Sequence, residues 1–208
     1  MLLANPLSPD TLLSGSGALL VLALILFAEC GLLIGFFLPG DTLLFAAGIS
    51  IATGTITTSL GAFLVVAPLA AIAGNLVGYW IGYRAGPIVF DRPNSRLFKP
   101  EYVTRAHDFF ERFGLWTILI GRFVPIVRTV ATVMAGVGRM RFSLYALYSV
   151  VGGIVWTDGV LLLGHALGKV EWVRAHRGWI DALVIVVVVL GLIPAAIHYW
   201  QGRSRRRV

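Results

Sequence analysis

Charged residues are scarce in this sequence. Asp, Glu, Lys and Arg together make up 13% of the 208 residues, whereas hydrophobic residues make up 58%. Soluble globular domains carry about 25% charged residues, so the composition excludes an ordinary soluble domain. A mean hydropathy of +0.86 agrees with that exclusion. At about 150 residues per domain, the length favours one domain that extends over residues 1–208.

The usual ligands of structural metals are also lacking. Cys30 is the single cysteine, which excludes an intrachain disulfide and argues against a cysteine metal site. The four histidines show no ligand spacing, so we expect neither a metal nor a cofactor. Lys and Arg are absent before Arg84, and a cleaved signal peptide would begin with a basic segment. We therefore expect the first apolar block to be a retained helix.

Long apolar blocks replace the amphipathic periodicity of soluble helices. They occupy residues 17–38, 60–83, 144–168 and 179–200. Each is close to, or longer than, the roughly 20 residues that a membrane-spanning helix needs. The sequence therefore predicts an all-α integral membrane protein with about four spanning helices.

Basic residues cluster at the ends of these blocks, which explains the net charge of +7. They lie in a polar linker at 84–112, at Arg139 and Arg141, and in the tail at 201–208. Basic residues that flank apolar helices mark the cytoplasmic side of a membrane. We interpret them as topology anchors rather than a nucleic-acid site. This places both termini in the cytoplasm of a multi-pass protein, with the lipid bilayer as its partner.

Two apolar segments are interrupted where a spanning helix should be continuous. Segment 39–58 begins with Pro-Gly-Asp, and segment 114–138 contains two arginines around a proline. If both 84–112 and 139–141 are cytoplasmic, 114–138 must enter and leave on the same side. Both segments follow the order G-x-F-x-P, a charged residue, Thr and a closing Ala-Gly. We predict two re-entrant hairpins, entering from opposite faces as an inverted repeat; chance similarity between Gly- and Phe-rich segments is the alternative.

Four ionisable residues lie within the apolar segments: Glu29, Asp41, Arg122 and Arg128. Each costs about 2.5–3.5 kcal/mol near the bilayer centre, so they must be paired, protonated or wetted. A buried ion-pair lock without a ligand is the structural interpretation. The functional interpretation gives the arginines to a phosphate group, whose geometry matches the planar guanidinium. The acids then take up and release protons, because burial disfavours the ionised carboxylate while a nearby arginine favours it.

Several other residues are weaker candidates. Thr129 is a candidate phosphate ligand beside Arg128, and Thr42 a candidate accessory beside Asp41. Asn75 is either structural hydrogen-bonding glue or a site residue, and Asp158 either joins a proton path or is a satisfied buried acid. Glycines at every fourth position are expected to serve close helix packing: Gly74, Gly78, Gly82 and Gly86. Five tryptophans are expected mostly as interfacial anchors: Trp116, Trp156, Trp172, Trp179 and Trp200.

The combination of these motifs over about residues 15–170 resembles the DedA family of membrane proteins. The similar stretches are Glu29 with 35–44 (GFFLPGDTLL), 78–82 (GYWIG), 121–129 (GRFVPIVRT) with 135–136, 152–156 (GGIVW) and 164–168 (GHALG). The resemblance implies two opposed re-entrant hairpins and translocation of undecaprenyl phosphate, and relatives are linked to phospholipid scrambling. The family's acids and arginines fall on the four ionisable residues above. Two departures, Asn75 for a frequent Asp and Thr132 for a frequent proline, put a titratable group and the hairpin bend in doubt.

From the residues and the resemblance, we expect a proton-coupled lipid transporter in the bacterial cytoplasmic membrane, with undecaprenyl phosphate or a similar polyprenyl phosphate as its cargo. A phospholipid scramblase and a proton-coupled exporter of small solutes are the alternatives. A membrane-embedded lipid phosphatase is less favoured, because no nucleophile and base stand at a recognisable spacing. We therefore expect a protein that is not an enzyme. A second copy of the chain, in a homodimer, stays a candidate partner.

Overall fold

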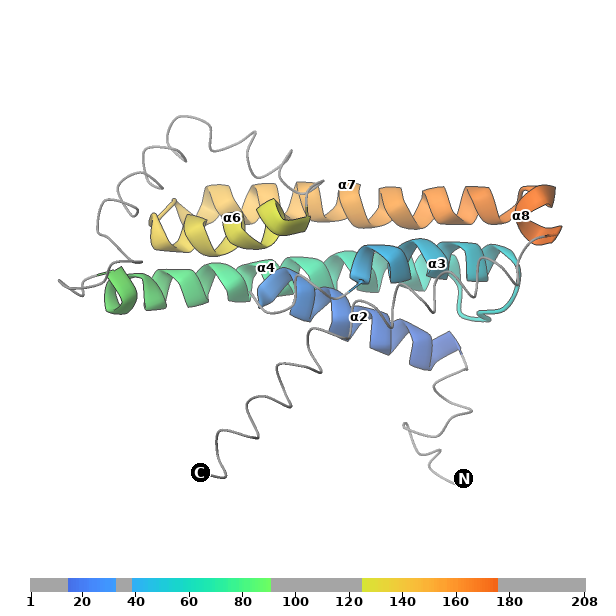
Figure 1. The fold of residues 1–208 in the computed structure, drawn as a ribbon, viewed down its shortest axis with the longest axis horizontal. Helices are drawn as coiled ribbons and strands as arrows, with labels where there is room; N and C mark the ends of the chain where they lie inside the picture. Colours follow the sequence, from blue (N-terminus) through green and yellow to red (C-terminus); the bar gives the residue numbers. More distant parts are fainter. Residues whose placement is uncertain (1–14, 33–38, 91–124, 176–208) are drawn as a thin grey trace, which may run out of the picture. The chain divides into compact units, whose positions relative to one another are not determined.

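The fold of the described residues is entirely helical. The computed structural model describes residues 15–32, 39–90 and 125–175 (Figure 1). Its helices are α2 (Gly15–Gly31), α3 (Gly40–Ala52), α4 (Leu60–Phe90), α6 (Pro125–Val137), α7 (Phe142–Gly168) and α8 (Glu171–Ala175). No strand occurs in these three ranges, which confirms the all-α prediction for them. The predicted helix 179–200 and the entry to the second hairpin at 114–124 lie outside the described residues.

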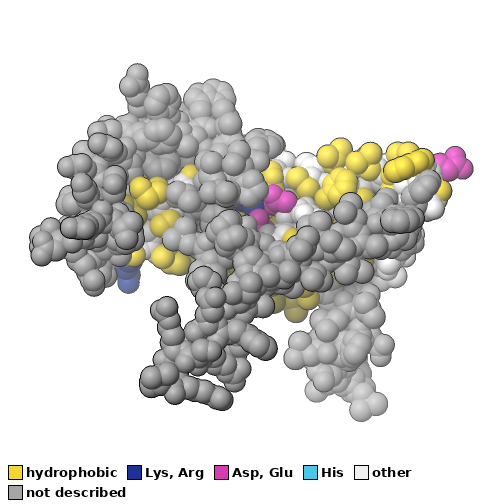
Figure 2. Space-filling view, in the orientation of Figure 1, with side chains coloured by type: hydrophobic (Ala, Val, Ile, Leu, Met, Phe, Trp, Pro, Cys, Tyr) yellow, Lys and Arg dark blue, Asp and Glu magenta, His cyan; other side chains and the backbone are white. Residues whose placement is uncertain are grey.

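Two of the described helices are long and apolar enough to cross a membrane. They are Leu60–Gly86 within α4 and Phe142–Gly168, which is α7, at 27 residues each. At 1.5 Å per residue such a helix is about 40 Å long, more than the roughly 30 Å of a bilayer's hydrocarbon core. Both helices expose large apolar side chains, and Figure 2 shows many such side chains on the described surface. Among the most exposed are Val65, Leu69, Val155 and Leu163.

One predicted helix end is wrong, and the structure describes parts of two other predicted segments. The helix expected over 17–38 is α2, which ends at Gly31, and glycine is a poor helix former. The linker expected to begin at residue 84 is helical up to Phe90, because a helix's backbone hydrogen bonds persist where the side chains become polar. Within the predicted hairpin 39–58, the chain forms one helix, α3, and a turn before α4 begins at Leu60.

α3 and the described part of α6 both have a proline at or beside their first residue. Each spans 13 described residues. Pro39 is the residue before α3, and Pro125 is the first residue of α6. Proline suits the start of a helix, because its φ is already helical and its missing N–H would have no partner there. Pro39 therefore stands at the start of a helix, and Pro125 is the first described residue of α6.

The two short helices also end alike, each with a residue in the left-handed conformation. After α3 this residue is Gly54, with φ 77°, and after α6 it is Arg139, with φ 51°. In each case the next N–H donates to the carbonyl five residues earlier, at 2.9 Å after α3 and 3.0 Å after α6. This is the Schellman ending of a helix, which reverses the chain and leads it into the following long helix. The left-handed position after α6 is thus held by an arginine, where the one after α3 is held by a glycine.

The chain divides into two compact units, which are described separately. The first comprises Met1–Leu26, Phe37–Ala67 and Thr157–Val208. Within it, α3 packs on the C-terminal part of α7 through glycines. A Cβ atom on Gly48 would meet the carbonyl oxygen of Leu161, and one on Gly164 would meet the carbonyl oxygen of Phe45. Backbone touches backbone, which only glycine permits.

The second unit comprises Phe27–Phe36 and Pro68–Trp156. Within it, α6 packs on α4 with the same register of contacts. A Cβ on Gly136 would meet the carbonyl oxygen of Tyr79, and one on Gly82 would meet the carbonyl oxygen of Val133. In both units each glycine faces the oxygen of the residue three positions before its partner glycine. In each unit, therefore, a short helix packs on a long helix with the same spacing of contacts: α3 on α7 in the first unit and α6 on α4 in the second.

These contacts predict which glycines tolerate a methyl group. Gly136→Ala should destabilise the protein by about 1–3 kcal/mol, because the methyl would overlap the backbone of α4. Gly159 on α7 is the matched control, since nothing lies within 4 Å of a Cβ there, and its alanine variant should be neutral or stabilised by about 0.5–1 kcal/mol. Thermal unfolding of the purified variants in detergent measures both. Equal melting temperatures for the two variants would contradict this packing.

Candidate functional site

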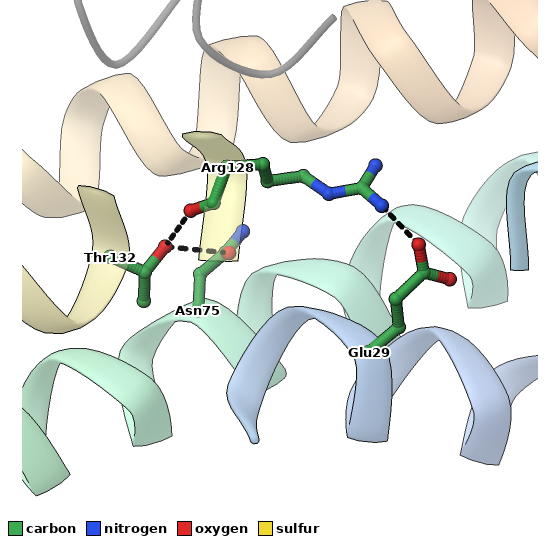
Figure 3. Close-up of polar contacts among 4 residues, drawn as sticks. All are labelled: Glu29, Asn75, Arg128 and Thr132. Carbon is green, nitrogen blue, oxygen red and sulfur yellow. Dashed lines mark hydrogen bonds and ion pairs between the residues drawn. The ribbon is translucent and has the colours of Figure 1, made fainter. Parts of the chain in front are cut away.

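A buried ion pair between α2 and α6 is the centre of the second unit (Figure 3). Arg128 Nη2 donates a hydrogen bond to Glu29 Oε1. The side chains of Arg128 and Glu29 are only 1% and 2% exposed. Because breaking a buried pair by removing one partner costs about 3–5 kcal/mol, each side chain depends on the other for its place in an apolar interior.

Close helix packing brings the two charges together. α2 crosses α4 where a Cβ on Gly31 would lie 2.8 Å from the carbonyl oxygen of Gly74, and Glu29 precedes this crossing by half a turn. One turn further along α4, a Cβ on Gly78 would lie 2.7 Å from Thr132 Cγ2 of α6. The predicted packing role of the α4 glycines is thus observed, since α2 and α6 both lie against α4 along one glycine stripe.

Thr132 and Asn75 form a polar group beside Arg128. Thr132 Oγ1 donates to the carbonyl oxygen of Arg128 at 2.9 Å, which fixes the backbone that carries the guanidinium. The same hydroxyl lies 3.4 Å from Asn75 Oδ1 of α4. Asn75 is fully buried, and its Nδ2 makes no hydrogen bond to the described residues. The amide therefore offers a buried donor next to the ion pair, as Figure 3 shows.

The backbone of Asn75 is held from α7. Tyr145 OH donates to the carbonyl oxygen of Asn75 at 3.1 Å, and the Tyr145 ring stacks on Tyr79 with centroids 4.8 Å apart. Tyr79 OH in turn donates to the carbonyl oxygen of Met140 at 2.6 Å. Both tyrosines have a bonded hydroxyl and a buried ring, as buried tyrosines generally do. They join α4, α7 and the end of α6 into one support for the site.

A tryptophan covers the guanidinium. Arg128 Cζ lies 4.2 Å from the ring centroid of Trp156, within the range of a cation–π interaction. The expectation that Trp156 is an interfacial anchor is wrong, because it is 5% exposed and lies mid-way along α7. Trp172, which lies in the short helix α8, is exposed, and the other three tryptophans in that expectation lie outside the described residues.

The remaining predicted site residues are distributed as follows. Asp41 and Thr42 lie in the first turn of α3, in the first unit, and both are half-buried. Asp158 on α7 belongs to that unit too, and its Oδ1 is buried without a hydrogen bond to the described residues. Thr129 follows Arg128 in α6, but its side chain lies outside the described residues. Arg122 also lies outside them.

The chemistry of the ion pair is that of a buried cation held by a carboxylate. As an ionised pair, Glu29 and Arg128 are together neutral, which the apolar interior tolerates. If Glu29 is neutralised or moves away, the permanently charged guanidinium needs another anion. Its planar set of donors fits the oxygens of a phosphate group or a carboxylate. Within the described ranges no group of three or more His, Cys, Asp and Glu side chains lies close enough to hold a metal ion.

Sequence reasoning missed Trp156 and Tyr145 as parts of the site. For Trp156 a signal was present, since it lies far from both ends of the apolar block 144–168, whereas interfacial anchors lie near helix ends. For Tyr145 no signal was present, since tyrosine near a helix end is typical of the interface as well.

Comparisons with known proteins agree on one family. The VTT domain matches residues 38–166, which is more than half of the chain. An uncharacterized membrane protein of Mycobacterium leprae is 41% identical over 187 residues, covering 88% of this chain and 80% of that protein. Protein DedA of Escherichia coli is 37% identical over 178 residues, covering 86% and 80%.

The inner membrane protein YqjA of Escherichia coli is 30% identical over 200 residues, covering 90% of this chain and 86% of that protein. No solved structure gives a significant match to the chain. The extent of the domain match and the identity to these membrane proteins over most of the chain agree with the two long apolar helices. This chain is therefore a membrane protein that belongs to the DedA family of VTT-domain proteins.

Proposed function

We propose that the protein transports undecaprenyl phosphate, or a similar anionic polyprenyl phosphate, across the bacterial cytoplasmic membrane, and that proton uptake drives the exchange. Membership of the family supports a transport-type role in the membrane. The observation that carries the proposal is the fully buried Glu29–Arg128 pair beside a buried amide donor. Such a pair contributes less to stability than apolar packing of the same volume, so its retention favours a functional role.

The proposed exchange keeps the site neutral at each stage. In the empty state the Glu29 carboxylate balances Arg128. When a phosphate headgroup arrives, it takes the place of Glu29 on the guanidinium, with the Asn75 amide as a second donor. The displaced carboxylate is then buried without its cation, and taking up a proton removes its charge. Asp41 is proposed to act likewise from α3, and Arg122 to serve as the second phosphate ligand.

The membrane arrangement in this proposal has two hairpins, around α3 and α6, that enter from opposite faces, with both termini in the cytoplasm. The repeated glycine register of α3 on α7 and of α6 on α4 supports two equivalent halves. Matching interrupted segments in two inverted halves are where transporters bind their cargo. The proposed role is non-covalent, with no bond of the lipid made or broken.

The direct test is flipping in liposomes that contain the purified protein. Labelled undecaprenyl phosphate should reach the opposite leaflet several times faster than in empty liposomes, whereas labelled phosphatidylethanolamine and phosphatidylglycerol should not. Equal acceleration of all three lipids would indicate a scramblase instead. Release of free phosphate from the label would indicate a phosphatase. No acceleration of any lipid, with accumulation of a small anionic solute against a proton gradient, would favour the exporter.

The shape of the guanidinium should matter as well as its charge. Arg128→Lys keeps the charge but replaces a planar fork with a point charge, so flipping should fall by about tenfold or more, equivalent to about 1.4 kcal/mol or more of lost phosphate binding. Arg122→Lys should behave similarly if it is the second ligand. Arg141→Lys, at an exposed position after α6, is the control and should flip normally. Normal flipping by both Arg128→Lys and Arg122→Lys, at equal expression, would defeat the bidentate binding of phosphate.

Neutralising the acids should uncouple transport from protons. Glu29→Gln and Asp41→Asn cannot exchange a proton, so both should still bind the phosphate headgroup but lose the response of flipping to an imposed pH gradient. Glu171→Gln, on the exposed surface of α8, is the control and should keep that response. The assay is flipping in proteoliposomes with and without the gradient, beside a binding measurement. Wild-type flipping that ignores the gradient over a range of external pH would rule out the coupling.

A further inference from the structure

Trp156 is placed where the proposed exchange has its greatest electrostatic difficulty. Arg128 is nearly inaccessible to solvent, so its positive charge needs a protein partner at every moment. Its carboxylate partner, Glu29, is the group that the phosphate is proposed to replace. Between the departure of one anion and the arrival of the next, a guanidinium without another partner would turn toward any nearby carbonyl or water.

The contacts of Arg128 with Glu29 and Trp156 do not compete. The hydrogen bond to Glu29 leaves from Nη2, at the edge of the planar guanidinium, because N–H donors lie in that plane. A cation–π contact uses the face of the aromatic ring, and Arg128 Cζ lies over the Trp156 ring, 4.2 Å from its centroid, close enough for the planar guanidinium to stack on the indole. The indole can therefore keep its contact whether the edge binds a carboxylate, a phosphate or neither. The indole carries no titratable group, so a change of protonation does not alter the ring.

Neighbouring residues hold both partners of this contact in place. The backbone of Arg128 is fixed by the hydroxyl of Thr132, so the side chain has one fixed end. Trp156 is itself 5% exposed and follows two buried glycines, Gly152 and Gly153, in α7. A cation–π contact is stronger in such a desolvated place than at a surface, and tryptophan is the strongest of the aromatic partners.

We propose that Trp156 is a positioning residue that holds the Arg128 guanidinium in its binding orientation while its counter-ion changes. The proposal rests on the proposed anion exchange at Arg128. It assigns to Trp156 no contact with the cargo: the ring acts through the arginine alone. Its consequence is that Trp156 matters most when Glu29 carries no charge, since the ring contact does not depend on that charge and remains to hold the guanidinium.

The test compares two substitutions, Trp156→Phe and Trp156→Leu, alone and in a Glu29→Gln background. Phenylalanine keeps an aromatic face, whereas leucine keeps only apolar volume. Binding of labelled undecaprenyl phosphate in proteoliposomes should be weakened about tenfold by leucine and much less by phenylalanine. The loss from leucine should be larger in the Glu29→Gln background. Trp172→Leu, at an exposed position in α8, is the control and should bind as the wild type does.

A spectroscopic measurement separates this proposal from the proposed function. In protein labelled with 5-fluorotryptophan, the ¹⁹F resonance that Trp156→Phe removes belongs to position 156. That resonance should shift on Arg128→Lys and on Glu29→Gln, without any lipid cargo, because the cation near the ring or its partner has changed. If wild-type protein binds no polyprenyl phosphate but the resonance shifts, the cargo is wrong and the role of Trp156 in holding Arg128 stands.

The proposal is overturned by either of two results. One is a resonance of position 156 that is unmoved by both Arg128→Lys and Glu29→Gln. The other is an equal loss of binding from phenylalanine and leucine, accompanied by equally lowered melting temperatures, which would show that Trp156 only fills space in α7.

Discussion

A charge in an apolar interior must be neutralised nearby, and the Glu29–Arg128 pair is where this requirement organises the second unit. The pair joins two residues that are 99 positions apart in the chain. The contacts around it are those needed to keep it in place, from the hydroxyl of Thr132 on the Arg128 backbone to the indole of Trp156 on the guanidinium face. Such support suits the proposed exchange of the arginine's partner.

Backbone contact at glycines brings the helices close enough for that pair to form. Gly74 and Gly78 let α2 and α6 approach α4 within the reach of short polar side chains. A side chain at Gly74 would meet the backbone of α2, and one at Gly78 would meet Thr132 Cγ2, so either would push a helix away from α4. The register of Gly82 and Gly136, where α6 meets α4, recurs where α3 meets α7 in the first unit. Close packing without a water-driven hydrophobic effect is the usual source of helix association in membranes, and each of the two units shows it once in this register.

Length and composition determined the helical, membrane-embedded character of this chain. A run of apolar residues long enough to span a bilayer has few alternatives to a helix, because lipid leaves no other partner for backbone N–H and C=O groups. Hence α4 and α7 were predictable, and so was the start of a helix beside Pro39. The ends of α2 and α4 were predicted less well, because a helix ends where its backbone hydrogen bonds end, and the apolar run continues past Gly31 in one case and stops before Phe90 in the other.

The sequence by itself also marked the costly residues, since an ionisable side chain in an apolar block is visible without any structure. It did not decide which of them meet. Blocks that are apolar on all sides carry no periodic stripe, so they do not show which face touches a neighbour. Only the tertiary structure paired Glu29 of α2 with Arg128, placed Asp41 in a separate unit, and turned Trp156 inward onto the guanidinium. These outcomes depend on helix crossings set by glycine backbones, and a crossing is a property of two helices rather than of either sequence.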